Sequence, residues 1–405
     1  TTLEKSPYFI SPTPQGLFVA YNPNILSKIL STRFLSTEQL SDRLQIAPAE
    51  LSRELDREPE PGQGILNRIA KELGVPPYSF FMEKAPALHD VLPDFRSSTA
   101  KPAAKMKETV QSIQFAEGVQ RALEQFWVKL DLPQFSAKGN AEVDAFALAA
   151  RELLSISLQD QLDAKDANAF YLVCRKKIED AGIFVLHDSF PEQDGSGFCL
   201  SHPRHPVIVV NTRKQTKGRR LFTLIHELAH VLMRSTGISD PFITRNSVER
   251  ICNRFAGSFL VPKLYVQALL KGPTTTQPDD EDVKWASRRL KISQEATVFR
   301  LEQLGIYTAG SYDRWKALVH GRNPDYFEKR GGPPGGEPPP QEKIKLSKYG
   351  FSFARAFDSL LRQGLISEVN LYRSTGLKPK YQRQYFDYVK SLTPDQLHTL
   401  ELDDE

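Results

Sequence analysis

The feature that most constrains how this chain can fold is an HExxH motif inside an apolar run, residues 219–232, with the sequence RRLFTLIHELAHVL. No Pro or Gly interrupts residues 221–234 and the leucines recur at helical spacing, which predicts a buried helix. Residues four apart lie on one helix face, so His226 and His230 can bind one zinc ion. Glu227 beside them can take a proton from the attacking water. The motif therefore indicates a zinc-dependent hydrolase.

A third metal ligand is expected on a second helix downstream. Residues 247–256 predict this helix, with Ser247 as its N-cap and Pro262 marking its end. Glu249 and Asn253 fall on one face, so Glu249 can complete a His2Glu site while Asn253 holds a ligand histidine by a hydrogen bond. The alternatives are a Glu249 that only interacts with the helix dipole and histidines that are ordinary helix side chains. Zn²⁺ is the expected cofactor, and Mn²⁺ is the alternative because such a site accepts several divalent ions.

The two helices carry a family resemblance. The segments RRLFTLIHELAHVLMR and SVERICNRFAGSFLVP resemble the ImmA/IrrE metallopeptidases, whose usual patterns are RFTLxHELxHxL and ExxANxFAxxLLxP. The likeness extends to residues 197–200 and 206–211, which resemble the strands before the zinc helix, and to residues 292–301, which resemble a closing helix. Cys252 stands where Ala is usual and places a thiol three positions from Glu249.

This resemblance implies a gluzincin-like zinc metalloendopeptidase, α+β in fold, with helices around a small β-sheet. The implied substrate is a protein, above all a transcriptional repressor, cut to derepress stress-response, mobile-element or defence genes. Two other functions compete with this one. The chain can be a helix-turn-helix DNA-binding regulator, or an antitoxin-like partner-binding protein, in which the metallopeptidase fold acts as sensor or scaffold.

Substrate contacts are expected near the metal. In gluzincin-like peptidases an edge strand pairs with the extended substrate by main-chain hydrogen bonds, and residues 197–200 or the β-branched run 207–210 can serve. Whichever run is not at the edge is then a core strand. His205 and Tyr265 are the candidates for stabilising the oxyanion, with surface or packing roles as the alternative.

The N-terminal residues predict an all-helical domain. Helices are expected at residues 24–33, 37–44, 49–56 and 64–73. With a tight turn at residues 45–48, this order resembles an Xre-type helix-turn-helix, which implies binding to duplex DNA. Ser52, Arg53 and Arg57 are the best candidates for base or phosphate contacts.

This domain departs from the Xre-type pattern in two respects. Gln45 replaces the usual turn glycine. Several carboxylates at or after the second helix of the motif would repel phosphates, namely Glu54, Asp56, Glu58 and Glu60. Pairing with a protein is therefore the main alternative to DNA binding.

The composition is that of a cytoplasmic globular protein, with 25% charged residues and a net charge of +4. No run of 18 apolar residues and no signal-peptide pattern occurs, so no membrane partner is expected. Cys174, Cys199 and Cys252 are too few for a disulfide framework and are expected to be small core residues. The alternative is a redox switch in which Cys199 or Cys252 approaches the zinc. The basic residues 213–220 can guide an acidic segment or a DNA strand towards the cleft, with solvated surface as the alternative.

Four regions are predicted along the chain. They are a helix-turn-helix domain at 1–90, a metallopeptidase domain with a helical connector at 91–328, a Pro/Gly-rich linker at 329–343 and a small helical domain at 344–405 ending in an acidic tail. Expected partners are a protein substrate and DNA, either as a duplex on the helix-turn-helix or as a single strand that activates. An oligomer is compatible with the sequence.

Overall fold

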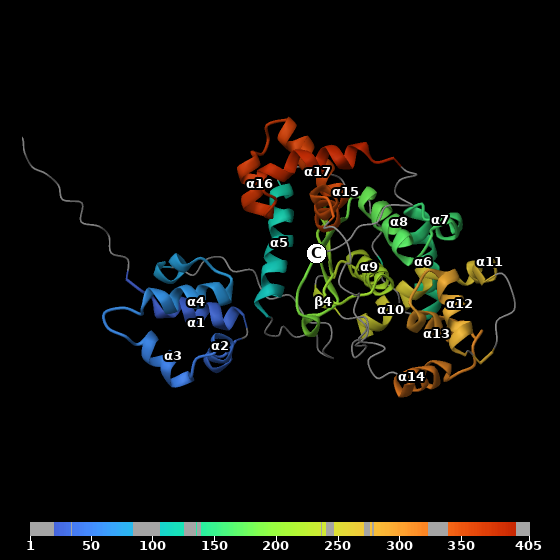
Figure 1. Ribbon diagram of the computed structural model, residues 1–405, viewed down its shortest axis with the longest axis horizontal. Coiled ribbons are helices and arrows are strands. Elements are labelled where there is room, and N and C mark those ends of the chain that lie inside the picture. The colour runs from blue at the N-terminus through green and yellow to red at the C-terminus, as the bar shows by residue number, and fades with distance from the viewer. Residues whose placement is uncertain are drawn as a thin grey trace, which may run out of the picture. The chain divides into compact units, whose positions relative to one another are not determined.

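The computed structural model describes residues 20–33, 35–83, 106–124, 135, 139–235, 237–239, 247–270, 276–277, 279–322 and 339–393. They belong to two compact units, Thr1–Val91 and Leu92–Glu405 (Figure 1). Most of the predicted Pro/Gly-rich linker and the whole acidic tail lie outside the described residues. None of the described helices combines the length and apolar composition needed to cross a bilayer.

The N-terminal unit is built from short helices. They are α1 (Pro23–Thr32), α2 (Thr37–Leu44), α3 (Pro48–Leu55), α4 (Gln63–Leu73) and the 3-10 helix η1 (Pro77–Phe81). Ser36 caps α2 in a capping box with Gln39, and α2 and α3 pack together across a short turn. Gln45 adopts the left-handed conformation in this turn, with a φ of 53°, where the Xre-type pattern has Gly. The predicted order of helices is thus present, while a DNA contact by α3 stays a prediction.

A small sheet organises the second unit. Its strands are β1 (Phe184–Asp188), β2 (Gly197–Leu200), β3 (Val207–Asn211) and β4 (Gly237–Ser239), in the order β1-β3-β2-β4. β3 runs parallel to β1 and antiparallel to β2, and β2 pairs antiparallel with β4. The expectation that residues 197–200 or 207–210 form a free edge is therefore wrong, because each of these strands has a neighbour on both sides. β1 and β4 are the edges of the described sheet.

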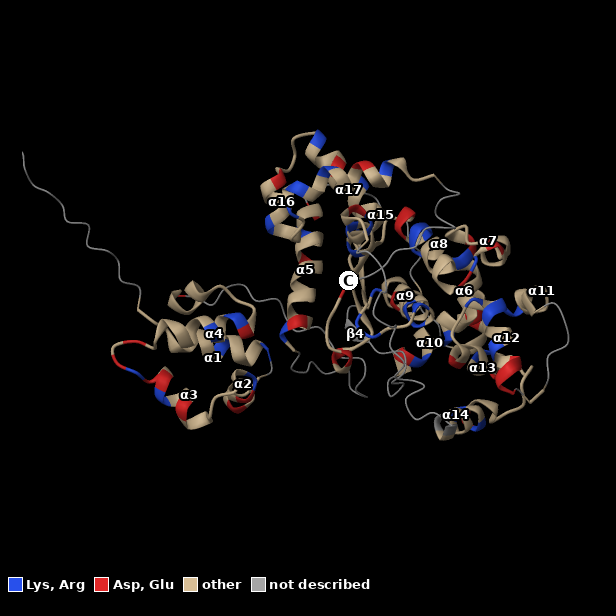
Figure 2. Cartoon of the chain, viewed as in Figure 1, with Lys and Arg blue, Asp and Glu red and all other residues tan. Residues whose placement is uncertain are grey.

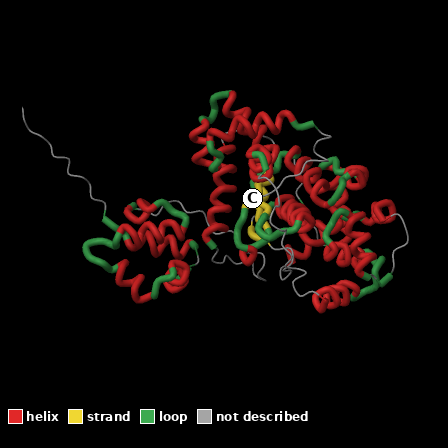
Figure 3. The backbone as a smooth tube through the Cα atoms, in the orientation of Figure 1, coloured by secondary structure: helices red, strands yellow, loops and turns green. Residues whose placement is uncertain are grey.

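Helices surround this sheet (Figure 3), which confirms the predicted α+β class. Between Lys107 and Arg322 they are α5 (Lys107–Glu124), α6 (Asn140–Leu153), α7 (Leu158–Asp163), α8 (Ala167–Asp180), α9 (Lys217–Leu232), α10 (Ser247–Leu260), α11 (Val266–Leu270), α12 (Asp280–Leu290), α13 (Gln294–Gln303) and α14 (Ser311–Arg322), with 3-10 turns η2 (Glu192–Asp194) and η3 (Lys263–Tyr265). The central helix α9 packs against β2, β3, α8 and α10. Its apolar face is fully buried, as the leucine spacing predicts.

The C-terminal helices are part of this same unit. They are α15 (Gln341–Arg362), α16 (Glu368–Thr375) and α17 (Pro379–Ser391). α15 packs on β1 and α8, and α16 lies against α5. This arrangement differs from the separate small domain expected at 344–405, and α15 begins inside the expected linker. The physical reason is a buried polar network, in which Arg175 donates to the Ser347 carbonyl at 2.8 Å and the Glu179 carboxylate accepts the N–H of Ser352 at 2.6 Å.

Candidate metal centre

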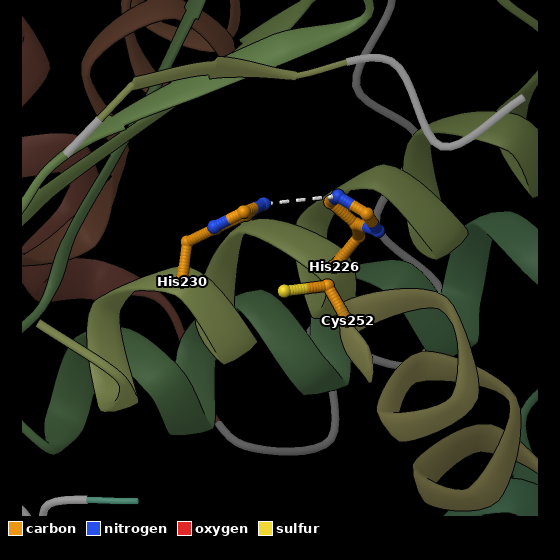
Figure 4. Close-up of side chains that lie close together, drawn as sticks. All are labelled: His226, His230 and Cys252. Atoms are coloured by element: carbon orange, nitrogen blue, oxygen red, sulfur yellow. Dashed lines mark hydrogen bonds between the residues drawn. The ribbon is translucent and has the colours of Figure 1, made fainter. Parts of the chain in front are cut away.

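The centre of the site is formed by the two histidines of α9. His226 and His230 are completely buried, and their Nε2 atoms lie 3.2 Å apart (Figure 4). One helical turn separates them, so both rings leave the same face of α9. This face is held in place because Thr216 caps the helix start and the opposite apolar residues pack into the core.

Glu249 of α10 meets both histidines. Its Oε2 lies 3.1 Å from His226 Nε2 and its Oε1 lies 3.2 Å from His230 Nε2. Burial raises the pKa of Glu249, but the charge of His226 and hydrogen bonds from both rings outweigh it and lower the pKa to about 2. The structure thus brings together the three residues that the sequence proposed as metal ligands.

The spacing of these three donors fits a tetrahedral cation. With ligand bonds of 2.0–2.1 Å, neighbouring donors around tetrahedral zinc lie about 3.4 Å apart. The observed separations of 3.1–3.2 Å are close to this value. Two imidazole nitrogens and a carboxylate also converge here without exposure to solvent, an arrangement that a bound cation stabilises. His226, His230 and Glu249 are therefore suited to hold a divalent metal.

Glu227 lies beside this group and close to the backbone of β2. It is fully buried, and a Cβ added to Gly197 would lie 3.2 Å from its Oε1. The same Cβ would lie 2.8 Å from Thr223 Cγ2 and 2.9 Å from the Val209 carbonyl oxygen. Gly197 therefore allows the sheet and α9 to approach each other at the site. No sequence motif predicts this role for Gly197, because only the packing of β2 on α9 reveals the requirement.

A hydroxyl group orients one of the histidines. Ser235 Oγ lies 2.9 Å from His230 Nδ1, so it can hold the ring with Nε2 directed at Glu249. Ser235 was not predicted from the sequence. Its place just beyond the C-terminal end of α9, five residues after His230, is a signal that could have found it. Asn253, expected to hold a histidine, is 8% exposed on α10, and that role stays a prediction.

Cys252 also borders the site. Its sulfur and one ring nitrogen each of His226 and His230 all lie within 4.8 Å of one another, and the residue is fully buried (Figure 4). Burial and then the nearby carboxylates of Glu249 and Glu227 raise the pKa of the Cys252 thiol well above its ordinary value. Cys252 is therefore buried, as expected of a core residue, and it also lies near the metal ligands, as the redox-switch alternative requires.

The other two cysteines are buried as expected. Cys199 donates from its sulfur to the Ser235 carbonyl oxygen at 3.1 Å. Cys174 lies in α8, where burial raises the pKa of its thiol to about 12. Both observations fit the expectation of small core residues.

The two oxyanion candidates take part in packing. The His205 main-chain carbonyl accepts a hydrogen bond from Gln120 at 2.9 Å, and the residue as a whole is 2% exposed. The ring of Tyr265 lies 5.1 Å from the guanidinium carbon of Arg151. These contacts support the packing alternative given for both residues.

The DNA-contact candidates lie on a surface of mixed charge. Ser52 and Arg53 on α3 and Arg57 after it are exposed. Figure 2 shows acidic and basic residues side by side on α3. The residues are therefore accessible, but the neighbouring carboxylates weaken the attraction of α3 for phosphate.

The small sheet, the HExxH helix and the buried His2Glu group are the features that a metallopeptidase domain requires. Residues 178–302 match the family model of the M78 peptidases, described as an IrrE N-terminal-like domain. This part of the chain, which runs from the end of α8 into α13, is therefore an IrrE N-terminal-like domain, as the resemblance to the ImmA/IrrE metallopeptidases predicts. None of the curated proteins compared with the chain matches it.

Proposed function

We propose that this protein is a zinc-dependent endopeptidase. The observation that carries the proposal is the convergence of His226, His230 and Glu249 within 3.2 Å of one another, with Glu227 buried beside them. Bound Zn²⁺ would supply Lewis-acid polarisation of the scissile carbonyl and of water. A manganese ion at the same ligands is the alternative.

Each residue has a distinct task in this proposal. His226, His230 and Glu249 hold the cation, and Ser235 fixes the ring of His230. Glu227 takes a proton from the attacking water and then delivers it to the leaving amine. Its burial on α9 keeps the carboxylate in the low-dielectric interior, where bulk water does not screen its charge.

The test combines metal content with cleavage in one set of variants. Glu227→Gln is expected to keep one metal per chain, measured by inductively coupled plasma mass spectrometry, and to lose cleavage by about 10²–10⁴-fold because the general base is gone. Glu249→Gln is expected to lose metal as well. Glu152→Gln, the same change at an exposed position of α6, is the matched control and should retain both. Cleavage by Glu227→Gln at the wild-type rate would refute the assigned role.

The substrate proposed is a transcriptional repressor, on the basis of the family resemblance. Purified protein is incubated with proteins encoded beside its gene, with and without single-stranded DNA, and the products are identified by mass spectrometry. Cleavage of one repressor at a defined bond supports the proposal. Full metal occupancy with no cleavage of any of these proteins contradicts it.

A second candidate function is duplex DNA binding by the N-terminal unit. It is favoured by the capped α2, the short turn to α3 and the exposed Arg53 and Arg57. If it holds, Glu227→Gln retains binding in fluorescence anisotropy, and Arg53→Gln weakens it and lowers its salt dependence. Unchanged binding in Arg53→Gln would remove Arg53 from the proposed contacts, and no duplex binding by the wild type would favour the protein-pairing alternative. Loss of cleavage in Glu227→Gln with zinc retained excludes a sensor or scaffold as the only function of the fold.

A further inference from the structure

We propose that Cys252 is a fourth protein ligand of the bound cation, so that this chain has a closed His2GluCys resting form. The proposal rests on the proposed function, because it assigns a state to the same metal site. It concerns a residue that distinguishes this chain from the ImmA/IrrE pattern, in which Ala is usual at this position.

The packing of two helices places the thiol at the site. Glu249 and Cys252 are three residues apart on α10, so they lie on the same face of that helix. This face is turned to α9, and the Cys252 sulfur lies within 4.8 Å of the ring nitrogens of both histidines. Figure 4 shows the sulfur directed towards the space beside the two rings. Two imidazoles and one thiol therefore lie within 4.8 Å of one another, and Glu249 contacts the same two imidazoles.

The distances allow ligation after a small adjustment. Around tetrahedral zinc, with a sulfur bond of 2.3 Å and nitrogen bonds of 2.0–2.1 Å, sulfur and nitrogen lie about 3.6 Å apart. The 4.8 Å limit on the sulfur–nitrogen separations leaves a shift of roughly 1 Å towards the two histidines, which is within the reach of a side-chain rotation at a single χ angle. The approach of Cys252 competes with no disulfide, because all three cysteines are free.

Ligation by Cys252 would change what the site can do. The S–H bond breaks, a metal–sulfur bond forms, and the proton passes to solvent. Zinc sites with four protein ligands are closed, whereas hydrolytic sites keep one position open for water. A bound Cys252 thus occupies the position that water needs, and each round of cleavage requires its exchange for water. Thiolate ligation also favours softer ions over Mn²⁺.

The competing explanation is that Cys252 only fills space. Cysteine is a small apolar residue, and a buried thiol can pack where the family has a methyl group. In that case the sulfur stays off the metal and its replacement by alanine leaves the ligand set unchanged. The two explanations differ in whether a sulfur–metal bond exists, which spectroscopy detects directly.

The experiment uses the full chain loaded with Co²⁺ in place of zinc. A thiolate ligand produces an intense sulfur-to-cobalt charge-transfer band in the near ultraviolet, whereas nitrogen and oxygen ligands do not. We expect this band in the wild type and in Cys199→Ala, and its loss in both Cys252→Ala and Cys252→Ser. Cys199→Ala is the matched control because it removes the thiol that contacts Ser235 while leaving the candidate ligand in place.

A wild-type spectrum without the band, or a band that persists in Cys252→Ala, overturns the proposal. The outcome is separable from that of the proposed function. Glu249→Gln tests the metal site itself, and cobalt that fails to bind the wild type overturns both. If cobalt binds the wild type without a charge-transfer band, only the role of Cys252 is refuted.

Metal competition gives a second readout. Removing a thiolate ligand should lower the preference for Cd²⁺ over Mn²⁺, measured as the ratio of dissociation constants, by about 10–100-fold, the range typical of losing one supporting group at a metal site. The ratio should not change in Cys199→Ala. An unchanged ratio in Cys252→Ala contradicts the proposal.

Discussion

Replacing Gly350 with alanine tests whether α15 is an integral part of the peptidase unit. Gly350 has a φ of 82° and a ψ of −175°, a conformation that residues with a Cβ rarely adopt. An added Cβ would lie 2.3 Å from Glu179 Oε1 and 2.9 Å from Arg175 Nη2. These two side chains form an ion pair at 2.8 Å that is wholly buried.

The expected cost of Gly350→Ala follows from these two effects. Backbone strain contributes about 1–3 kcal/mol. Displacing one partner of a buried, hydrogen-bonded ion pair contributes about 3–5 kcal/mol. Together they lower the free energy of unfolding by about 4–8 kcal/mol, a large part of the roughly 5–15 kcal/mol that stabilises a typical domain.

Urea unfolding followed by circular dichroism measures this loss. Gly364→Ala is the matched control, since Gly364 has a φ of 68° but no atom within 4 Å of an added Cβ. It isolates the cost of the backbone conformation, about 1–3 kcal/mol. The collision with the buried ion pair is refuted if the two variants lose the same unfolding free energy to within about 1 kcal/mol, because backbone strain alone then accounts for the loss.

Three further predictions concern the bound metal, the pH dependence of stability and the buried side chain of Arg151. Zinc at 100 times its dissociation constant should stabilise the folded protein by about 2.7 kcal/mol, and EDTA should remove this stabilisation. Differential scanning fluorimetry should record the loss as a fall in Tm, and Glu249→Gln should show no such fall. Burial and then Arg175 lower the pKa of His187 well below 6.5, so only the unfolded chain takes up this proton as the pH falls below 6.5. Stability should therefore fall by up to about 1.4 kcal/mol per pH unit in that window, and urea unfolding at pH 7 and pH 5.5 should find a smaller loss in His187→Gln. The buried Arg151 guanidinium donates hydrogen bonds to the carbonyls of Ile156 and Phe259 at 2.9 and 2.8 Å. Arg151→Lys should therefore lower the free energy of unfolding by about 3–5 kcal/mol in the same urea assay, and a decrease below about 1 kcal/mol would contradict this.

The candidate metal site was accessible from the sequence because its residues follow short-range patterns. His226 and His230 share a face through helical periodicity alone, and Glu249 and Asn253 do so on the next helix. The helices of the N-terminal unit were predictable for the same reason, since capping residues such as Ser36 act within one turn. The meeting of the two site helices required the family resemblance, because periodicity does not say which helices pack together.

The neighbours of the site were beyond the sequence. Ser235 and Gly197 were missed because their importance depends on distances to His230 and Glu227 that only the packed structure sets. The position of β2 inside the sheet was also not predictable, because the three-residue strand β4 that covers its outer side carries no signal of its own. For Cys252, a core role and a role near zinc were both compatible with the sequence, and the packing of α10 on α9 brings its sulfur to the histidines.

What the sequence determined by itself is the chemistry of the site: an HExxH helix, an acidic residue on a following helix and an α+β frame around them. These depend on residue types and on spacings within single elements, which the chain specifies locally. What only the tertiary structure decided is which segments belong together. The C-terminal helices join the peptidase unit because Glu179 of α8 finds hydrogen-bond donors on the backbone of α15, far along the chain. Such pairing arises from the burial of charged groups that need partners, and it becomes visible only when the whole unit is packed.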